Sequence, residues 1–162
     1  MQKDPRAAVF DALSNTAAGM LGVDDSGQHM QPMTHFADAE AATVCFITSA
    51  ETDLARAVGQ GARAHYCVAA PDDGVYACLR GTLVQSQDSG KLDELWSPAA
   101  AAWFKEGRDD PNVMLLQLNL QDAALWAAST SAIATGIEIA RANLSTGHQP
   151  DLGEHVAVRF DT

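Results

Sequence analysis

The chain has 162 residues, 47% of them hydrophobic, so it is long enough to bury one sizeable core. Its 10 Lys and Arg stand against 21 Asp and Glu, and the resulting charge of −11 argues against binding to nucleic acid or to an anionic membrane surface. No apolar run approaches the about 20 residues that cross a bilayer, and the N-terminus lacks a secretory signal pattern, so we expect a cytoplasmic protein with no membrane segment.

The first third of the sequence predicts one helix and three strands. Asp4 and Pro5 are typical of a helix start, and a helix is expected over residues 5–13. Three stretches rich in apolar or β-branched residues follow, and they are expected to be strands at residues 18–23, 29–36 and 43–48. The turn-forming residues between the first two indicate an antiparallel meander.

The middle of the sequence predicts a short helix and two long strands. Residues 52–58 form the helix, which Gly59 ends. The strands are expected at residues 62–70 and 75–87, joined by the turn Pro71–Gly74. Gly81 inside the second strand predicts a bulge or bend, which a barrel needs in order to close.

The last third predicts helices at residues 89–96 and 99–105, strands at 112–120 and 123–127, and a helix at 133–144. We expect a single domain over residues 1–162, with its core at about residues 6–142 and a polar tail at 145–162. Short strands with interspersed helices indicate an antiparallel barrel rather than a parallel sheet. Because the sequence has no glycine-rich nucleotide motif, dinucleotide-binding folds and kinases are poor candidates.

The cysteines and histidines give no pattern typical of a metal site. Cys45, Cys67 and Cys78 lie in apolar strand-like runs without Cys-x-x-Cys spacing, and no two histidines are at helical ligand spacing. Zinc is the alternative, but buried small hydrophobes explain the cysteines more simply, and we predict no metal. His35 is read as a hydrogen-bonded structural residue. Packing between helices is the expected role of Trp96, Trp103 and Phe104.

A series of short motifs runs through most of the chain in a fixed order. The motifs are Gln31-Pro-Met-Thr34, Thr43–Ser49, Thr52-Asp-Leu54, Gly61-Ala-Arg-Ala64, the strand leading to Gly81, Leu95-Trp96, Ala102-Trp-Phe104, Asp109-Asp-Pro111 and Leu125-Trp126. In this order and spacing the chain resembles the pyridoxamine 5′-phosphate oxidase-like superfamily, most closely its general stress protein 26 branch. The resemblance covers roughly residues 6–142.

The resemblance implies a mainly β fold with helices: a six-stranded antiparallel split β-barrel that forms a homodimer. Such dimers hold FMN, or less often FAD, in two grooves between the subunits. A flavin needs a flat apolar slot, backbone hydrogen-bonding groups and an anion site. The candidate flavin-binding residues are Gln31, Pro32, Met33, Thr34, Ile47, Thr48, Ser49, Thr52 and Trp126.

For several candidates a purely structural role is the alternative. The hydroxyls of Thr48, Ser49 and Thr52 precede a helix, where they would face a phosphate or simply cap the helix. Met33 and Trp126 would be ordinary packing residues, although the resemblance places Trp126 against the flavin.

Two positions depart from what the resemblance implies for phosphate binding. Gln31 stands where the family usually has arginine, and Leu54 where it has lysine, while Glu51 and Asp53 add negative charge beside them. Each lost charge-assisted hydrogen bond is worth about 1.5 to 3 kcal/mol, so FMN binding would weaken by roughly two to four decades. Arg56 and Arg63 are the candidate replacements.

The sequence therefore predicts a flavin-binding protein of the general stress protein 26 type, or a flavin-dependent oxidoreductase whose substrate the residues do not name. The alternative is a split-barrel dimer that has lost tight flavin binding and binds another small molecule or a protein. True pyridoxamine 5′-phosphate oxidase activity is disfavoured. After Trp126 the chain offers only Arg141 and Arg159 where those oxidases have an arginine-rich motif.

Overall fold

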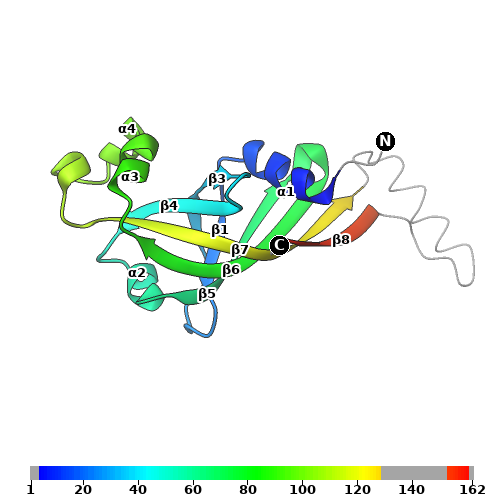
Figure 1. Cartoon of the computed structure of the whole chain (residues 1–162), viewed down its shortest axis with the longest axis horizontal. Helices are drawn as coiled ribbons and strands as arrows, with labels where there is room; N and C mark the ends of the chain where they lie inside the picture. The colour runs from blue at the N-terminus through cyan, green and yellow to red at the C-terminus, as the bar shows by residue number, and fades with distance from the viewer. Residues whose placement is uncertain (1–3, 129–152, 161–162) are drawn as a thin grey trace, which may run out of the picture.

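The computed structural model describes residues 4–128 and 153–160, and the expected helix at 133–144 lies outside them. Its helices, 3-10 turns and strands follow one another as α1 (Pro5–Ser14), β1 (Ala18–Val23), β2 (Gln31–Thr34), β3 (Phe36–Asp38), β4 (Thr43–Ser49), α2 (Asp53–Val58), β5 (Ala62–Ala70), η1 (Pro71–Asp73), β6 (Val75–Ser86), α3 (Ser89–Leu95), α4 (Pro98–Ala101), η2 (Gly107–Asp109), β7 (Val113–Ala128) and β8 (Gly153–Arg159) (Figure 1).

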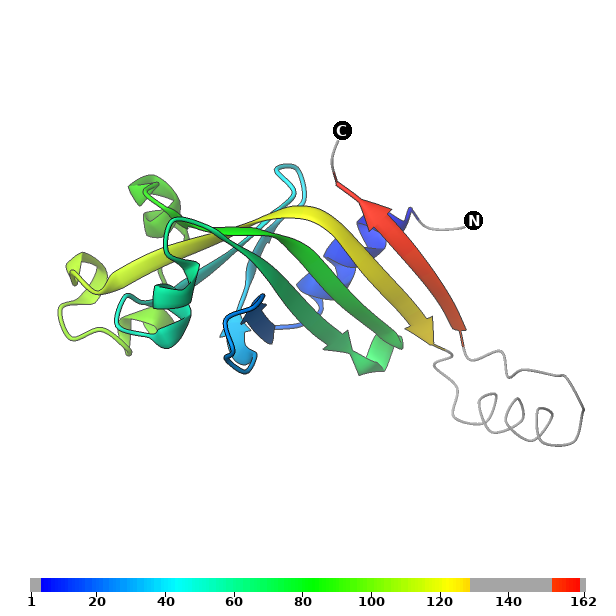
Figure 2. The same ribbon diagram turned by 90° about the horizontal axis from the view of Figure 1, so that it is seen from below.

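The strands form one curled antiparallel sheet in the order β2-β1-β5-β6-β7-β4-β3, with β8 added beside β7. The mainly β, antiparallel prediction is confirmed, but the described residues contain eight strands where six were expected. Figure 2 shows the long strands β6 and β7 bending together, with β8 running alongside the second half of β7. One edge of β7 thus pairs with β4 along Val113–Asn119 and with β8 along Asp122–Ala128.

A bulge at the middle of β7 produces this change of partner. The register shifts between Arg80 and Gly81 of β6, which pair with Asp122 and Leu120, so Gln121 is the extra residue. Gly81 is required there because a Cβ would overlap the backbone of Asn119. The predicted bulge is confirmed. It bends β7 without ending it, so the two strands expected at 112–120 and 123–127 are a single strand.

The single strand expected at residues 29–36 was also wrong, because it is divided between the two ends of the sheet. β2 pairs with β1, β3 pairs with β4, and His35 lies between them. The chain therefore crosses from one end of the curled sheet to the other at this point. Pro32 is tolerated because β2 is an end strand of the described sheet, where a missing N–H costs little.

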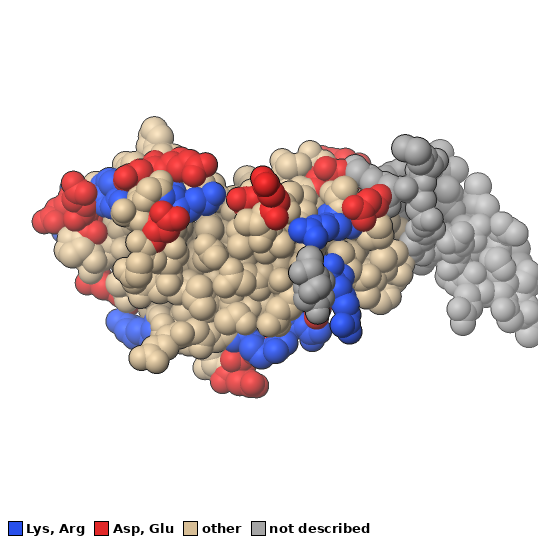
Figure 3. All heavy atoms as spheres, viewed as in Figure 1, with Lys and Arg blue, Asp and Glu red and all other residues tan. Residues whose placement is uncertain are grey.

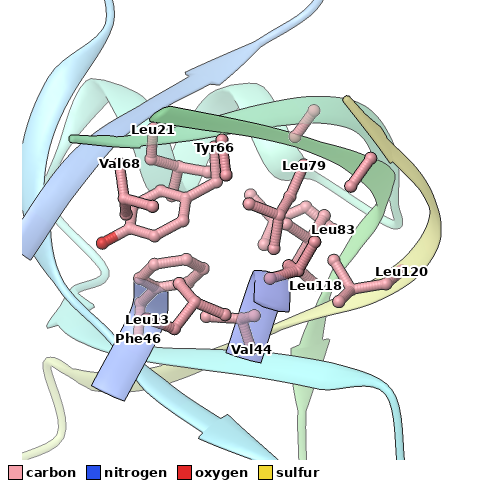
Figure 4. Close-up of a cluster of buried hydrophobic side chains, with 14 of the residues drawn as sticks. Leu13, Leu21, Val44, Phe46, Tyr66, Val68, Leu79, Leu83, Leu118 and Leu120 are labelled. Carbon is pink, nitrogen blue, oxygen red and sulfur yellow. The ribbon is translucent and has the colours of Figure 1, made fainter. Parts of the chain in front are cut away.

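The hydrophobic core fills the inside of the curled sheet, and α1 covers it. Val9, Ala12 and Leu13 of α1 are buried in the same cluster as strand residues such as Phe46 and Tyr66. Figure 4 shows the ring of Tyr66 beside Leu21 and Val68, with Leu13 and Phe46 facing it across the core. A further small cluster packs α3 against β4 and β7 through Cys45, Leu92 and Leu115.

Two other expectations differ from the structure. The second short helix covers only Pro98–Ala101 instead of 99–105, and its start is capped by Ser97, whose hydroxyl accepts from the N–H of Ala100. The stretch read as a polar tail contains β8, because His155, Ala157 and Arg159 alternate with the inward-facing Val156 and Val158. Among the described helices, none is long and apolar enough to cross a membrane.

Candidate functional site

A groove of about 390 Å³ lies where the curled sheet fails to close, between β2 and β4. Pro32, Met33 and Thr34 of β2 form one wall, and Ile47, Thr48 and Ser49 of β4 form the other, with Thr52 at one end. Seven of the nine predicted site residues therefore meet in one place. The remaining lining residues are Phe36, Ser97, Ala99, Ala100, Trp103 and Phe104.

The three hydroxyl residues at the end of β4 shape the start of α2. The hydroxyl of Thr52 accepts from the N–H of Ala55 at 3.1 Å and donates to the carbonyl of Ser49 at 2.8 Å. The hydroxyl of Ser49 accepts from the N–H of Glu51 at 3.2 Å. Thr52 thus caps α2, which was the alternative expected for it, and Ser49 stabilises the turn before the helix. Thr48 is buried and lines the groove.

The α4 segment forms the third side of the groove, and none of its residues is among the predicted site residues. Trp103 was expected to pack between helices, but its side chain is 85% exposed at the rim. The reason is that α4 ends at Ala101, so Trp103 lies on the following turn. Trp96 and Phe104 do pack together, with ring centroids 5.8 Å apart. The Ala102-Trp-Phe104 motif was the available signal for this wall.

A chain of buried hydrogen bonds fixes the β2 wall to the core. His35 donates from Nε2 to the carbonyl of Leu13 at 2.7 Å, and its Nδ1 lies 2.6 Å from the hydroxyl of Tyr66. That hydroxyl donates to the carbonyl of Met33 at 2.9 Å. His35 therefore has the structural role expected of it, and it couples α1 to the groove wall.

Trp126 lies in a different hollow, of about 480 Å³, on the outer face of the sheet. Its indole stacks on the imidazole of His155 with centroids 4.9 Å apart, and it is 44% exposed. Met20 and Tyr76 line the same hollow and are also exposed, at 41% and 44%. Among residues 4–128 and 153–160, only Pro32 lines both hollows. Gln31 lines neither one, and its amide donates to the sulfur of Met33 at 3.6 Å.

Comparison with known proteins identifies the family to which this fold belongs. Residues 4–151 match the model of the family described as pyridoxamine 5′-phosphate oxidase like. The chain belongs to this family. Its resemblance to the general stress protein 26 branch is confirmed by a relative from Bacillus subtilis (strain 168), general stress protein 26. That relative is 28% identical over 131 residues, which cover 78% of this chain and 91% of the relative.

Solved structures support the same assignment. A protein assigned as general stress protein 26 from Jannaschia sp. CCS1 is 36% identical, and the match covers 94% of this chain and 96% of that one, with a TM-score of 0.75. The general stress FMN/FAD binding protein from Xanthomonas citri is 30% identical over 78% of this chain and 90% of that chain, with a TM-score of 0.70.

The structure separates the two positions at which the family resemblance implies phosphate-binding cations. Gln31 is half-buried at the start of β2, next to the groove wall. Leu54, in contrast, is only 2% exposed and belongs to the main core. A lysine at position 54 would bury its charge among apolar side chains, so this position cannot carry the missing cation in the observed packing.

The two candidate replacement cations do not line the groove either. Arg56 forms a salt bridge with Asp53 at 2.9 Å, which offsets its charge. Arg63 lies on the outer face of β5, opposite Thr82 of β6. Acidic side chains gather at the α3–α4 end of the molecule, where Lys and Arg side chains lie among them (Figure 3). In the part of the chain that the structure describes, the groove has apolar walls and hydroxyl groups. No lysine or arginine is among its described lining residues.

The described residues contain no group of three or more His, Cys, Asp or Glu side chains arranged to hold a metal ion. Cys45 is buried, as expected, but Cys67 and Cys78 are half-buried on the outer face of the sheet. The expectation that all three cysteines are buried was therefore wrong for two of them. Their strands are covered by the core on one face only.

Proposed function

We propose that this protein binds a flavin in the groove between β2 and β4. The observation that carries the proposal is the meeting of seven predicted site residues around one groove of about 390 Å³. This volume lies in the range of small-molecule sites, about 300–1,000 Å³. A relative at 30% identity is the FMN/FAD binding protein of Xanthomonas citri, and it shares the fold.

The lining residues fit the flavin ring better than they fit its phosphate. Met33, Ile47 and Phe36 offer apolar surface for a flat ring, and β2, as an end strand, offers backbone groups along one edge. Thr48, Ser49 and Thr52 offer hydroxyls and backbone at one end of the groove. Because none of the described lining residues is a cation, FMN should gain little over riboflavin.

A bound flavin would supply redox chemistry that no side chain of the groove provides. The protein's own part would be to orient the ring between β2 and β4 and to limit its contact with water. Trp103, at the exposed rim, is placed to cover one side of a bound ring. We propose an oxidoreductase role only to this extent, since the groove residues do not identify a substrate.

We further propose that the protein is a homodimer and that a second copy brings Trp126 to the groove. In one copy Trp126 and the groove lie in separate hollows. The outer face presents Met20, Tyr76 and Trp126, each more than 40% exposed, and exposed apolar patches of this kind mark interaction sites. A symmetric dimer through this face would cover them.

The test is a titration of the purified protein, stripped of any bound cofactor, with FMN, FAD and riboflavin, followed by flavin fluorescence. Saturable binding of one flavin per chain, with FMN and riboflavin within about tenfold of each other, is the expected result. If none of the three binds, the flavin proposal is wrong. The alternative, a barrel that binds another uncharged small molecule in this groove, then becomes the better explanation, since no cation is among the described residues of the lining.

A further inference from the structure

Cys67 of β5 and Cys78 of β6 lie directly opposite each other in the sheet. Both side chains point to the outer face, because Tyr66, Val68, Ala77 and Leu79, the residues on either side, are buried in the core. Both cysteines line the hollow that contains Trp126. They form a pair across two central strands, which residue spacing along the chain does not reveal.

The hydrogen-bond pattern of the sheet places the two cysteines in a close type of pair. The N–H of Asp24 donates to the carbonyl of Arg63 at 2.9 Å, so the backbone polar groups of Arg63 face β1. Residues two apart along a strand point their backbone groups the same way, and those of Cys67 therefore also face β1.

Cys67 and Cys78 are accordingly a non-hydrogen-bonded pair of the β5–β6 ladder. In such pairs the Cα atoms are about 4.5 Å apart and the side chains are at their closest. Disulfides need Cα atoms about 4.4–6.8 Å apart, so the backbone spacing of this pair suits a disulfide.

The two thiols also interact with each other. A hydrogen bond from the thiol of Cys78 lowers the pKa of Cys67 from its usual value to about 7, and burial opposes this shift. The same hydrogen bond and burial raise the pKa of Cys78, while the charges of His65 and Arg80, on the same face, act in the opposite direction. Cys67 is thus the better nucleophile at neutral pH, since thiolates react and thiols do not.

We propose that Cys67 and Cys78 form a redox-active dithiol that reacts with hydroperoxides and closes to a disulfide across β5 and β6. This site is separate from the proposed flavin groove. Cys67 is the attacking residue and Cys78 the resolving residue. In the single chain the hollow of about 480 Å³ leaves both half-buried thiols open to a small hydroperoxide, and the proposal requires that the proposed dimer leave a path into this hollow.

The reaction balances in two steps. The Cys67 thiolate attacks the terminal oxygen of the hydroperoxide, the O–O bond breaks, and the alcohol or water leaves after taking a proton. The resulting sulfenic acid is then attacked by the sulfur of Cys78. Its hydroxyl departs as water with the proton of Cys78, and the S–S bond forms. The dithiol loses two electrons and the hydroperoxide gains them.

The experiment treats the full-length, reduced protein with hydrogen peroxide or an alkyl hydroperoxide and counts free thiols after unfolding. We expect the three thiols of the chain to fall to one, because Cys45 is 1% exposed, with a loss of two hydrogen atoms from the intact mass. Peptide mapping should join Cys67 to Cys78, and dithiothreitol should restore both thiols. Cys45→Ala is the matched control and should form the same disulfide.

Two variants separate the roles of the pair. Cys78→Ser should stop at a sulfenic acid on Cys67, which a dimedone-type reagent traps. Cys67→Ser should consume peroxide at least about tenfold more slowly, because the remaining thiol has little thiolate at neutral pH.

Three intact thiols in the wild type, or disulfides only between chains, would overturn the proposal. Equal rates of peroxide consumption in Cys78→Ser and Cys67→Ser would also overturn it. If a second copy covers this face too tightly for peroxide to enter, the thiols stay intact and the proposal fails while the dimer proposal stands. The flavin titration is unaffected by either result, since it reports on the other groove.

Discussion

Tyr66 shows how a single hydroxyl connects the core to the groove. It lies between Nδ1 of His35 and the carbonyl of Met33, and its ring is fully buried. Tyr66→Phe should lower the free energy of unfolding by about 1 to 3 kcal/mol, because it leaves buried polar atoms without their partner. Urea denaturation measures the change, and Tyr76→Phe, at a 44% exposed side chain, should change stability by less than about 0.5 kcal/mol. Equal effects of the two variants would contradict this role.

Gln31 tests whether the groove has lost its phosphate subsite. Its amide donates to the sulfur of Met33, which lines the groove, so an arginine at this position starts on the same side of β2 as Met33. Gln31→Arg should tighten FMN binding by about tenfold and should leave riboflavin binding nearly unchanged. The gain corresponds to one charge-assisted hydrogen bond to the phosphate, weakened by exposure and salt. Fluorescence titration of both ligands measures this, with Gln87→Arg, an exposed position outside the groove lining, as the control for net charge. Equal tightening of both ligands would place the phosphate elsewhere.

Cys67 should show the reactivity of a thiolate at neutral pH. Since its pKa is lowered to about 7 by the hydrogen bond from Cys78, its alkylation rate by iodoacetamide should rise through pH about 7 instead of near 9. Below that pH the group is protonated and the rate falls. Cys78→Ala removes the donor and should shift the rate profile to higher pH, whereas Cys78→Ser keeps a donor and should preserve it. A profile that is the same in all three proteins would show that Cys78 does not set the pKa.

For single residues, the sequence predicted which ones meet at the groove better than it predicted the direction in which a side chain points. The motifs at Pro32–Thr34, Ile47–Ser49 and Thr52 point to one site, and these residues do line one groove. The inward direction of Leu54 could not be predicted, because a six-residue helix has too few turns for a hydrophobic stripe to fix its rotation. The pairing of Cys67 with Cys78 depends on the register of β5 and β6, which no local pattern specifies.

At the scale of elements, Gly81 lies opposite the bulge at which β7 stops pairing with β4 and starts pairing with β8. Gly81→Ala should destabilise the fold by at least about 2 kcal/mol, because the new methyl group overlaps the backbone of Asn119 and neither strand can move away easily. Gly90→Ala is the matched control. It lies in α3 with only an ordinary contact to Asp88, and alanine there should stabilise by up to about 1 kcal/mol. Thermal unfolding of the two variants should move in opposite directions; a shift in the same direction would refute the argument.

The elements with strong local signals were predicted well, and those set by the sheet were not. Helix α1 and strands β1, β4 and β5 begin and end within one or two residues of their expected positions. The break at His35 was missed because the apolar pattern continues through it, and only the need to cross the open side of the sheet divides β2 from β3. β8 was missed because its polar outer residues hide the alternation of Val156 and Val158.

For the whole molecule, the question is whether one copy holds a complete site. The groove and Trp126 occupy two hollows that have Pro32 in common, and the outer face carries the exposed apolar residues Met20, Tyr76 and Trp126. If a second copy completes each groove, light scattering should give twice 17.1 kDa. A monomer at micromolar concentration would contradict both the dimer and the shared groove.

A mixing experiment tests the shared groove directly. Trp126→Ala removes the proposed contribution of one copy, and Thr34→Trp fills the groove of the other; both positions are exposed, so both variants should fold. Each variant alone should bind riboflavin at least about tenfold more weakly than the wild type. After subunit exchange in an equimolar mixture, half of the dimers contain one chain of each variant. Each of these mixed dimers has one intact groove facing one intact Trp126, so about one quarter of all grooves should regain wild-type affinity. If Trp126 acts on the groove of its own chain, mixing restores nothing, since every chain then carries its own defect. If Trp126 does not act on the groove at all, Trp126→Ala alone binds riboflavin as tightly as the wild type.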